Sequence, residues 1–374
     1  MKLSDARARI DEIDEELVKL FLSRMEISRN VAEIKINQGL PVLNQKREEE
    51  ILSSVNEKAG EHGSAARLFF SAIMDISRAY QHELMTASNC PLKGILEGAE
   101  SSFKADSVLA CQGTEGAYSH AAARTFFKAA KPCFYSSFEE VFKAVEEGRA
   151  DYGVLPVENN LAGSVTEVYD LILKYKFFIT GTAEVEVHHC LLGVKGASKE
   201  GLRKVYSHPQ ALAQCSEFIK AQKLEAAPDS NTAVAAERIS KLNDTQIGVI
   251  ASREAAETHG LEVLECDIQN VRDNRTRFIL ISKNLIIPTN ADIISLSFSL
   301  PHTTGSLYKI LGRFAIHGLN LTKIESRPLY GSSFEYQFYL DFAGTAKDKD
   351  IVQLLCSLEE ELPFFSFLGN YSEV

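Results

Sequence analysis

"SVLACQGTEGAYSH", residues 107–120, is the stretch at which the hydrophobic pattern of the chain changes. A short apolar run ends in a glycine-rich turn at Gly113, and a helical pattern follows the turn. Further short apolar runs alternate with helical stretches up to residue 284. This alternation predicts a two-lobed α/β domain over 107–284, with a largely parallel sheet and a cleft between the lobes.

Upstream of this stretch, residues 1–90 predict a helical domain. Ser4 is the expected N-cap of a first helix of about 30 residues, and Gly39 is expected to end it. Further helices are expected over 44–58 and 65–86. So long a helix cannot build the core of a small domain by itself, so we expect it to pair with its copy in a second chain. The apolar seam, spaced by three and four residues, is Ile10, Ile13, Leu17, Leu20, Ile27, Val31 and Ile34.

The remaining segments are two linkers and a C-terminal domain. Residues 91–106 and 285–292 are expected to be linkers. Residues 293–374 carry the order strand, helix, strand, strand, helix, strand, which predicts a ferredoxin-like βαββαβ fold.

Composition narrows the classes of function. The 374 residues are 45% hydrophobic and 24% charged, with a formal net charge of -11. We therefore expect a soluble protein without a nucleic-acid or membrane partner, since both partners require a basic surface. The charged N-terminus predicts no signal peptide and a cytoplasmic protein, so the seven cysteines are expected to be buried, reduced thiols.

No sequence motif indicates a cofactor or a metal site. His188 and His189 are adjacent and would point to opposite faces of a strand, and no Cys/His pair has metal-ligand spacing. No G-x-G-x-x-G follows a strand, which argues against a nicotinamide dehydrogenase. We infer neither a metal nor a cofactor.

One position in the helical seam is charged. Arg24 stands where an aliphatic residue belongs, with Arg7 and Lys35 flanking the same seam. Such a residue can pair with a glutamate of a neighbouring helix. Ser77 and Gln81, at i and i+4 of the third helix, favour the alternative, a bundle pocket for a small polyanion.

Residues 3–85 resemble the all-helical chorismate mutases, through "RARIDEIDEELVKLFLSRMEISRNVAEIK" (7–35), "LPVLNQKREEEIL" (40–52) and "DISRAYQ" (75–81). The resemblance implies an intertwined dimer in which Arg7 comes from the other chain. It also implies a rearrangement without acid, base or nucleophile, driven by positioning and fixed donors. Asn44 departs from the family, where Asp is common. The implied substrate-binding residues are Arg7, Arg24 and Arg47 for carboxylates, Lys35 and Gln81 for the ether oxygen, Glu48 and Asn44 for the ring hydroxyl, and Ser77 for a carboxylate.

Polar residues cluster after the strands of the α/β domain, at the edge where ligands bind in such folds. Alone, each loop has an ordinary structural explanation: a glycine turn, a residue before proline at His208, or helix capping by Ser230 and Thr232. The candidates are Ser119, Glu158, Asn159, Ser164, Ser207, His208, Gln210, Thr232, Thr276, Arg277 and Phe278.

Residues 107–284 resemble prephenate dehydratase, through "GAYSH" (116–120), "VLPVENNLAGSV" (154–165), "YSHPQALAQC" (206–215) and "NRTRF" (274–278). The resemblance implies that prephenate loses its ring hydroxyl and carbon dioxide, and that Thr276 is required. Thr276 would polarise the leaving hydroxyl, and Arg277 would clamp a carboxylate. Glu158 either supplies the proton or pairs with an arginine.

Strand geometry separates these residues. Period-2 alternation places Thr276 and Phe278 on one face and Arg275 and Arg277 on the other. Arg277 reaches the site only if the strand begins after it, which makes the Thr276 hydroxyl the firmer prediction.

The C-terminal "GSLYKILGRFAIHGLNLTKIESRP" (305–328) resembles the ACT ligand-binding domain of amino-acid-controlled enzymes, in its phenylalanine-sensing form. The alternative is a purely structural dimerisation domain. Related sequences often read Gly-Ala-Leu at 305–307. The implied allosteric site is Gly305, Ser306, Leu307, Asn320, Leu321, Glu325, Ser326, Arg327 and Pro328.

Together the three segments predict a bifunctional enzyme of phenylalanine biosynthesis that binds chorismate, prephenate and L-phenylalanine, as a homodimer or homotetramer. Two alternatives stay open. One is a solute-binding protein, since a two-lobed cleft also suits a receptor. The other retains one catalytic domain for assembly only.

Overall fold

The computed structural model describes residues 2–85, 90–129, 131–328 and 336–374. The chain forms two compact units, Met1–Gly98 with Ile294–Phe367 and Ala99–Ile293 with Leu368–Val374. The first unit therefore combines the predicted helical domain with most of the predicted C-terminal domain. Among the described residues, no helix is both long and apolar enough to cross a membrane.

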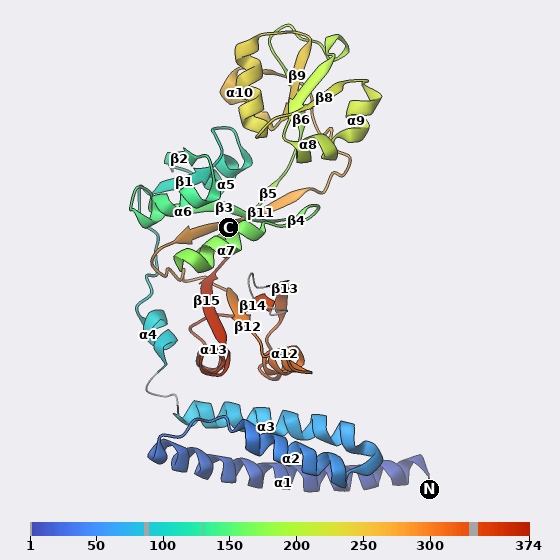
Figure 1. Ribbon diagram of the computed structural model, residues 1–374, viewed down its shortest axis with the longest axis vertical. Helices are drawn as coiled ribbons and strands as arrows, with labels where there is room; N and C mark the ends of the chain where they lie inside the picture. Colours follow the sequence, from blue (N-terminus) through green and yellow to red (C-terminus); the bar gives the residue numbers. More distant parts are fainter. Residues whose placement is uncertain (1, 86–89, 130, 329–335) are drawn as a thin grey trace. The chain divides into compact units, whose positions relative to one another are not determined.

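Three helices form the N-terminal part of the first unit: α1 (Leu3–Gln38), α2 (Gln45–Lys58) and α3 (Gly63–Met85) (Figure 1). Helix α1 has 36 residues, which corresponds to about 54 Å at 1.5 Å per residue. It ends at Gly39, with φ of 63°, as predicted. The predicted cap was wrong, because Lys2 is the N-cap and the hydroxyl of Ser4 bonds instead to Asp5, 3.1 Å away. Position 86, the predicted end of the third helix, lies outside the described residues.

The apolar seam of α1 is solvent-exposed in the single chain. Ile13 is 54% exposed and Leu20 is 68% exposed, although both belong to the predicted packing face. Helices α2 and α3 pack on each other, and α3 packs on α1, so the seam points away from the bundle's own contacts.

The first predicted linker contains a helix and a covalent bond. Helix α4 (Pro91–Glu97) occupies part of 91–106, where no element was expected. Cys90, its N-cap, forms a disulfide with Cys356, at a Cα–Cα distance of 5.8 Å. The prediction that all seven cysteines are free thiols was wrong, because the fold brings together two cysteines that are 266 residues apart in the sequence.

The C-terminal part of the chain has the predicted order of elements. Its strands form one sheet in the order β13-β14-β12-β15, with α12 and α13 packed on α3. Phe298, Phe314 and Phe342 are fully buried in its core. The elements are β12 (Ile293–Ser299), α12 (Ser306–Ile316), β13 (Leu321–Pro328), β14 (Tyr336–Ala343), α13 (Lys349–Glu361) and β15 (Phe364–Tyr371).

The second unit is built on two sheets joined by two crossing segments, 187–189 and 266–274. The first sheet has the order β2-β1-β3-β11-β5, with β4 paired to β3. Its strands are β1 (Val108–Gln112), β2 (Lys131–Tyr135), β3 (Tyr152–Asn159), β4 (Gly163–Ser164), β5 (Phe178–Glu186) and β11 (Arg275–Ser282). The second sheet has the order β10-β6-β9-β7-β8. Its strands are β6 (Cys190–Gly193), β7 (Lys204–Ser207), β8 (Glu225–Pro228), β9 (Ile247–Ala251) and β10 (Glu262–Glu265).

Both sheets are mixed, so the prediction of a largely parallel sheet was wrong. Strand β11 returns from the second lobe and runs antiparallel to both β3 and β5. In the second sheet, β6 runs antiparallel to β9 and β10, while β7 is parallel to β8 and β9. The two lobes and the cleft between them were predicted correctly.

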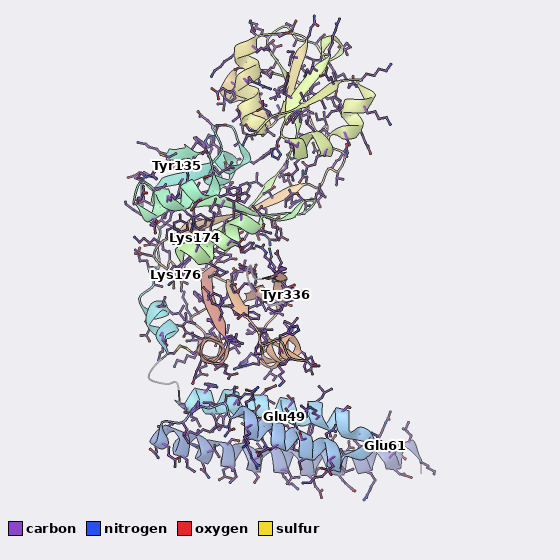
Figure 2. All side chains as sticks on the ribbon, in the orientation of Figure 1. Glu49, Glu61, Tyr135, Lys174, Lys176 and Tyr336 are labelled. Carbon is purple, nitrogen blue, oxygen red and sulfur yellow. A yellow bond between two sulfur atoms is a disulfide. The ribbon has the colours of Figure 1, made fainter. Side chains whose placement is uncertain are left out.

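Amphipathic helices cover the two sheets. In the first lobe, Lys174 of α7, which is labelled in Figure 2, pairs with Glu139 of α6 at 2.7 Å, on helices that contact each other and the sheet. In the second lobe, α10 packs on β9 and β7. The helices are α5 (Tyr118–Phe126), α6 (Phe138–Glu146), α7 (Thr166–Tyr175), α8 (Pro209–Gln214), α9 (Ser216–Ala221), α10 (Thr232–Leu242) and α11 (Arg253–His259).

Candidate active sites

A cavity of about 160 Å³ lies between the lobes of the second unit, beside the two crossing segments. Residues of α5, β3 and β11 in the first lobe, together with α8, the residue before it and the beginning of α10 in the second, complete its wall. Its lining residues are Tyr118, Asn159, Val187, His189, His208, Gln210, Ala211, Gln214, Thr232, Asn274 and Thr276. The sequence predicted five of them, namely Asn159, His208, Gln210, Thr232 and Thr276.

The buried amide of Asn159 holds the hydroxyl of Thr276. Asn159 Nδ2 donates to Thr276 Oγ1 at 3.0 Å, to Asn274 Oδ1 at 2.8 Å and to the carbonyl of Arg275 at 2.9 Å. Asn159 Oδ1 accepts from two backbone N–H groups of the following turn, at 3.1 and 2.9 Å, which settles the orientation of the amide. The oxygen of Thr276 is therefore an acceptor for Asn159, and its own hydrogen is available to donate into the cavity.

A second polar group lines the cavity around His189. Its Nε2 lies 2.9 Å from Gln214 Oε1, and its Nδ1 lies 3.3 Å from the hydroxyl of Tyr118. Tyr118 also donates to the carbonyl of His188 at 2.9 Å. Burial lowers the pKa of His189 and raises the pKa of Tyr118 well above its usual value. Both side chains are therefore neutral hydrogen-bonding groups near pH 7.

The beginnings of α8 and α10 supply His208 and Thr232. His208 is the N-cap of α8 and accepts from the backbone N–H of Gln210 at 3.3 Å. Helix α10 is capped by Asn231, whose side chain accepts from Ala233 at 2.8 Å. The expectation that Ser230 or Thr232 caps this helix was wrong, and the side chain of Thr232 lines the cavity instead.

The arginines of 272–278 do not line the cavity. Strand β11 begins at Arg275, so the condition under which Arg277 could reach the site is not met. Arg277 pairs with Glu158 at 3.5 Å and with Glu184 at 3.0 Å. The structure thus favours the ion-pair interpretation of Glu158, and it places the expected carboxylate clamp outside the cleft. None of the lining residues that the structure describes is a lysine or an arginine.

Four further candidates lie outside the lining. The hydroxyls of Ser119 and Ser207 donate to backbone carbonyls, at 2.6 and 2.5 Å. Phe278 is 3% exposed and belongs to the core of the first lobe, and Ser164 lies on β4 opposite Glu158. Serine hydroxyls often satisfy nearby backbone carbonyls, and here this holds for Ser119 on α5 and for Ser207 at the end of β7.

A second cluster lies inside the helical part of the first unit. Lys35 on α1 donates to Gln81 Oε1 on α3 at 3.1 Å and also to the carbonyl of Val42. Arg24 donates to the hydroxyl of Ser77 and to a carbonyl of α3. Burial lowers the pKa of Arg24 and of Lys35, and the nearby charge of Glu48 opposes this shift. Because Lys35 occupies Gln81 Oε1, the Nε2 donors of Gln81 remain available.

Other predicted members of this cluster are separate from it. Glu48 pairs with Arg78, which also pairs with Asp75. The side chain of Asn44 caps α2, accepting from the backbone N–H of Arg47 at 3.1 Å. The guanidinium of Arg47 is 68% exposed and pairs with a glutamate of its own helix.

Arg7 is exposed and stands 17 residues before Arg24 on the same helix. That separation is about 25 Å along the helix axis. Arg7 therefore cannot reach the cluster of its own chain.

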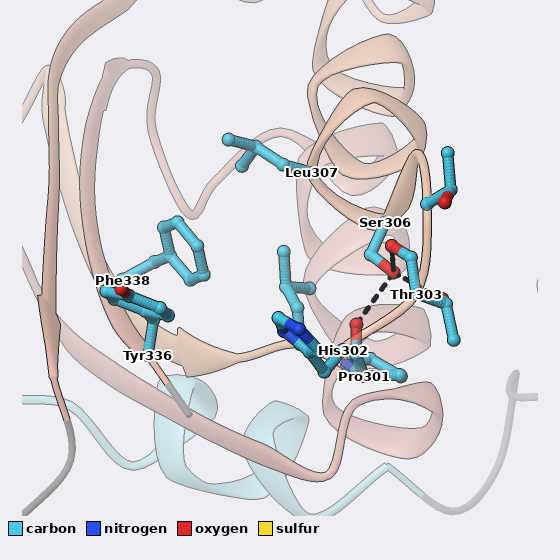
Figure 3. A pocket seen from close by; sticks show the side chains of 9 residues that line it. Pro301, His302, Thr303, Ser306, Leu307, Tyr336 and Phe338 are labelled. Atoms are coloured by element: carbon cyan, nitrogen blue, oxygen red, sulfur yellow. Dashed lines mark hydrogen bonds between the residues drawn. The ribbon is translucent and has the colours of Figure 1, made fainter. Parts of the chain in front are cut away.

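A second cavity, of about 370 Å³, lies in the C-terminal part (Figure 3). The turn before α12 forms one wall, where Ser306 Oγ lies 2.8 Å from the carbonyl of Pro301 and 2.7 Å from Thr303 Oγ1. The side chains of Tyr336 and Phe338 lie on the opposite side (Figure 3). The lining residues are Leu300, Pro301, His302, Thr303, Thr304, Ser306, Leu307, Tyr336 and Phe338.

Only two predicted allosteric residues, Ser306 and Leu307, line this cavity. Gly305 is the N-cap of α12 with φ of 82°, a conformation that favours glycine. The remaining candidates lie outside the lining: Asn320, Leu321, Glu325, Ser326, Arg327 and Pro328. Arg327 pairs with Glu325 at 2.9 Å.

Comparison with known proteins identifies the family. Residues 6–82 match the family model for chorismate mutase type II, and residues 109–285 match that for prephenate dehydratase. A bifunctional chorismate mutase/prephenate dehydratase from Aquifex aeolicus is 34% identical over 376 residues, which cover 99% of this chain and 98% of that protein. The chain belongs to the bifunctional chorismate mutase/prephenate dehydratase family. It is an enzyme with both activities, an isomerase and a lyase, on one chain.

Two further relatives bear on its dehydratase unit. Arogenate dehydratase 3 from Arabidopsis thaliana is 39% identical over 281 residues, covering 70% of this chain and 66% of that protein. A structure of prephenate dehydratase from Arthrobacter aurescens in complex with L-Phe is 30% identical, with a TM-score of 0.65, and covers 71% of this chain and 89% of that one.

Sequence reasoning missed several residues of the dehydratase cleft. Tyr118 stands inside the quoted motif "GAYSH", and Gln214 lies four residues after Gln210 on α8, so both were within reach of a helical-face argument. His189 was considered only as a metal ligand. Asn274 was visible in "NRTRF", but its role as the acceptor for Asn159 depends on a contact across 115 residues.

Proposed function

We propose that Gln81 and Lys35 stabilise the ether oxygen of chorismate while the rearrangement breaks its bond to carbon. The reaction needs no proton transfer, so fixed donors supply the stabilisation. The support is the Lys35–Gln81 hydrogen bond at 3.1 Å, which turns the Nε2 donors of Gln81 away from Lys35. Arg24, with its pKa lowered by burial but still a cation near pH 7, is the partner for a substrate carboxylate.

The dehydratase site works through the hydroxyl of Thr276. In the reaction the carboxylate leaves as carbon dioxide, its bonding electrons enter the ring, and the hydroxyl departs from the opposite carbon with a proton. Thr276 donates a hydrogen bond to that departing oxygen and keeps its own proton, because Asn159 already occupies the acceptor side of the threonine oxygen; the proton that completes the leaving water comes from solvent. This single hydrogen bond is the observation that carries the proposal. Amides, hydroxyls and the neutral imidazole of His189 around the cavity are left to hold the substrate carboxylates.

A direct assay tests both assignments. Purified protein receives chorismate, and chorismate, prephenate and phenylpyruvate are measured over time. Formation of phenylpyruvate supports both activities. Accumulation of prephenate would show that the dehydratase domain is inactive, and binding of chorismate without turnover would support a receptor. Because relatives at 39% identity are arogenate dehydratases, arogenate is supplied in a parallel reaction. A higher kcat/KM for arogenate would reassign the second step.

The mutase site is completed by a second copy of the chain. Two observations support this proposal: the exposed apolar seam of α1, with Ile13 at 54% and Leu20 at 68% exposed, and the distance of about 25 Å that keeps Arg7 from Arg24 in one chain. Pairing of two α1 helices buries the seam and brings Arg7 of one copy to the cluster of the other. Sedimentation over a range of concentrations distinguishes monomer, dimer and tetramer.

Phenylalanine regulates the enzyme from the C-terminal part, which we assign as an ACT domain. The cavity between Ser306, Leu307, Tyr336 and Phe338 suits an aromatic amino acid, and a related dehydratase was solved with L-Phe. The carboxylate of the bound phenylalanine would lie at the beginning of α12. Tyr336→Ala removes an aromatic wall of the cavity and should raise the phenylalanine concentration for half-inhibition about tenfold. Unchanged inhibition by this variant would contradict the site.

A further inference from the structure

The disulfide between Cys90 and Cys356 links the beginning of α4 covalently to α13, across 266 residues of sequence. Cys90 begins α4, which follows the helical part, and Cys356 is buried on α13 of the C-terminal part. We propose that Cys90 and Cys356 are a reversible redox site that controls how firmly α13 stays docked against the helical part. Its consequence for mutase activity rests on the mutase site proposed above.

The fold itself aligns the two cysteines. The carboxylate of Glu359 on α13 accepts from the backbone N–H of Leu92 at 3.2 Å and lies 3.4 Å from Cys90 Sγ. Leu92 is only 2% exposed, so the beginning of α4 is packed against α13 and not merely near it. The two thiols therefore stay neighbours when the bond is reduced, which is the requirement for a reversible pair.

One turn further along α13, the same interface is polar. His82, the residue after Gln81 on α3, lies between Glu360 at 3.0 Å and Glu361 at 2.8 Å. Within the C-terminal part, Glu361 also pairs with Arg313 of α12 at 3.0 Å. Burial raises the pKa of Glu361, but its hydrogen bond with His82 and the charge of Arg313 outweigh that effect and lower it. Without the disulfide, the contacts of His82 with Glu360 and Glu361 are among those that still join α3 to α13.

The docked interface reaches the proposed mutase site through α3. Asp75 lines a cavity of about 240 Å³ between α3, α12 and α13, and it pairs with Arg78. Arg78 in turn pairs with Glu48 on α2. On α3, the donor Gln81 is therefore the direct neighbour in sequence of His82, which contacts the C-terminal part. Movement of α13 away from α3 changes the surroundings of Arg78 and Glu48.

The chemistry is thiol–disulfide exchange with a low-molecular-weight disulfide such as oxidised glutathione. Cys90 is half-buried and Cys356 is 5% exposed, so Cys90 is the thiol that the reagent reaches. Its thiolate forms a mixed disulfide and releases one reagent thiol. Cys356 then displaces the second reagent thiol. Two protein thiols are oxidised, one reagent disulfide is reduced, and the two thiol protons end on the two released reagent thiols.

The first experiment follows the bond in the full-length protein. Wild type is equilibrated in glutathione buffers from fully reduced to fully oxidised, quenched in acid, unfolded, alkylated and digested. The expected result is a linked peptide pair containing Cys90 and Cys356 that disappears in reduced glutathione. The other five cysteines, Cys111, Cys133, Cys190, Cys215 and Cys266, are expected to remain alkylated throughout. Seven alkylated cysteines under oxidising conditions, or a different linked pair, would overturn the proposal.

The second experiment measures docking by hydrogen exchange in peptides covering 75–85 and 349–361. The oxidised enzyme should exchange at least about tenfold more slowly there than the reduced enzyme, because a covalent tether keeps α13 at high effective concentration. Equal exchange in the two forms would refute control of docking by this bond.

Two variants complete the test. Cys356→Ser should behave like the reduced enzyme in every buffer, and Cys133→Ser, at an exposed position on β2, should behave like wild type. If Cys356→Ser fails to fold, the reduced wild-type enzyme provides the same comparison without a substitution. Mutase kcat/KM is measured on the same samples and should differ between oxidised and reduced enzyme. A redox-dependent exchange rate in a protein without mutase activity would refute the proposed function and leave the redox site standing.

Discussion

Replacement of Thr276 by valine tests the dehydratase site most directly. Valine has the shape of threonine without the hydroxyl, so the change removes one donor and one acceptor and leaves the packing of the half-buried side chain in place. Dehydration of prephenate should be lost, while the mutase of the same chain should keep its activity.

The structure allows the effect of Thr276→Val on the free energy of unfolding to be estimated separately from its effect on kcat. Thr276 accepts one hydrogen bond from Asn159 at 3.0 Å, and the amide keeps its acceptors at 2.8 and 2.9 Å after the substitution. The folding cost is therefore about 1 kcal/mol, the net value of one hydrogen bond. A donor aimed at developing charge is worth about 3–4 kcal/mol, so kcat should fall by about 10²–10³.

The assay uses the mutase as an internal reference. Chorismate is supplied to wild type and to Thr276→Val, and prephenate and phenylpyruvate are measured separately. The variant should consume chorismate at the wild-type rate and accumulate prephenate. Its melting temperature should fall by only about 2–4 °C. Thr276→Ser, which keeps the hydroxyl, is the matched control and should retain activity within about tenfold.

Two results would refute the reasoning. Normal phenylpyruvate formation by Thr276→Val would remove the hydroxyl from the mechanism. A fall in activity that Thr276→Ser reproduces fully would show that the methyl packing, and not the hydroxyl, is what the reaction requires.

Three further predictions concern the helical part. Gln81→Ala should lower mutase kcat by about 10²–10³ with dehydratase activity on supplied prephenate unchanged, and normal chorismate turnover would contradict the role of Gln81. Burial lowers the pKa of Lys35 from 10.5, so mutase activity should fall with rising pH, and the fall should begin below pH 10.5. Lys35→Arg should remove this alkaline loss, measured as kcat/KM against pH. Ile13→Asp places a charge in the exposed seam and should shift sedimentation toward the monomer and reduce mutase activity at low concentration, whereas an unchanged oligomer would contradict pairing through α1.

The helices were predictable because their signals are local. Three- and four-residue spacing and Gly39 located α1, and both ends of α2 and the start of α3 were predicted to within about two residues. Strands β2 and β8 were missed. Both are edge strands, and each contains a proline, at Pro132 and Pro228, which is atypical of a central strand.

The direction of β11 and the 90–356 disulfide were beyond local reasoning. A strand's sequence is the same whichever way it pairs, so the antiparallel return of β11 between β3 and β5 follows only from the path of the chain. Similarly, nothing in the spacing of Cys90 and Cys356 indicates contact across 266 residues. Period-2 alternation at Thr276 and Arg277, by contrast, was sufficient to predict which side chain enters the cleft.

Arg277 was expected to clamp a substrate carboxylate, and the structure leads to a different arrangement. Arg277 is held by Glu158 and Glu184 on the neighbouring strands, so its charge is compensated within the sheet. These pairs cross between β11 and its neighbours β3 and β5, which are the strands that carry Asn159 and lead into the crossing segment at 187–189. The ion pairs therefore fix the strand that carries Thr276. The cleft itself offers amide and hydroxyl donors, which can bond carboxylates without a countercharge. The acidic net charge and an anionic substrate are compatible for this reason: the local donors bind the substrate, and the arginines position them.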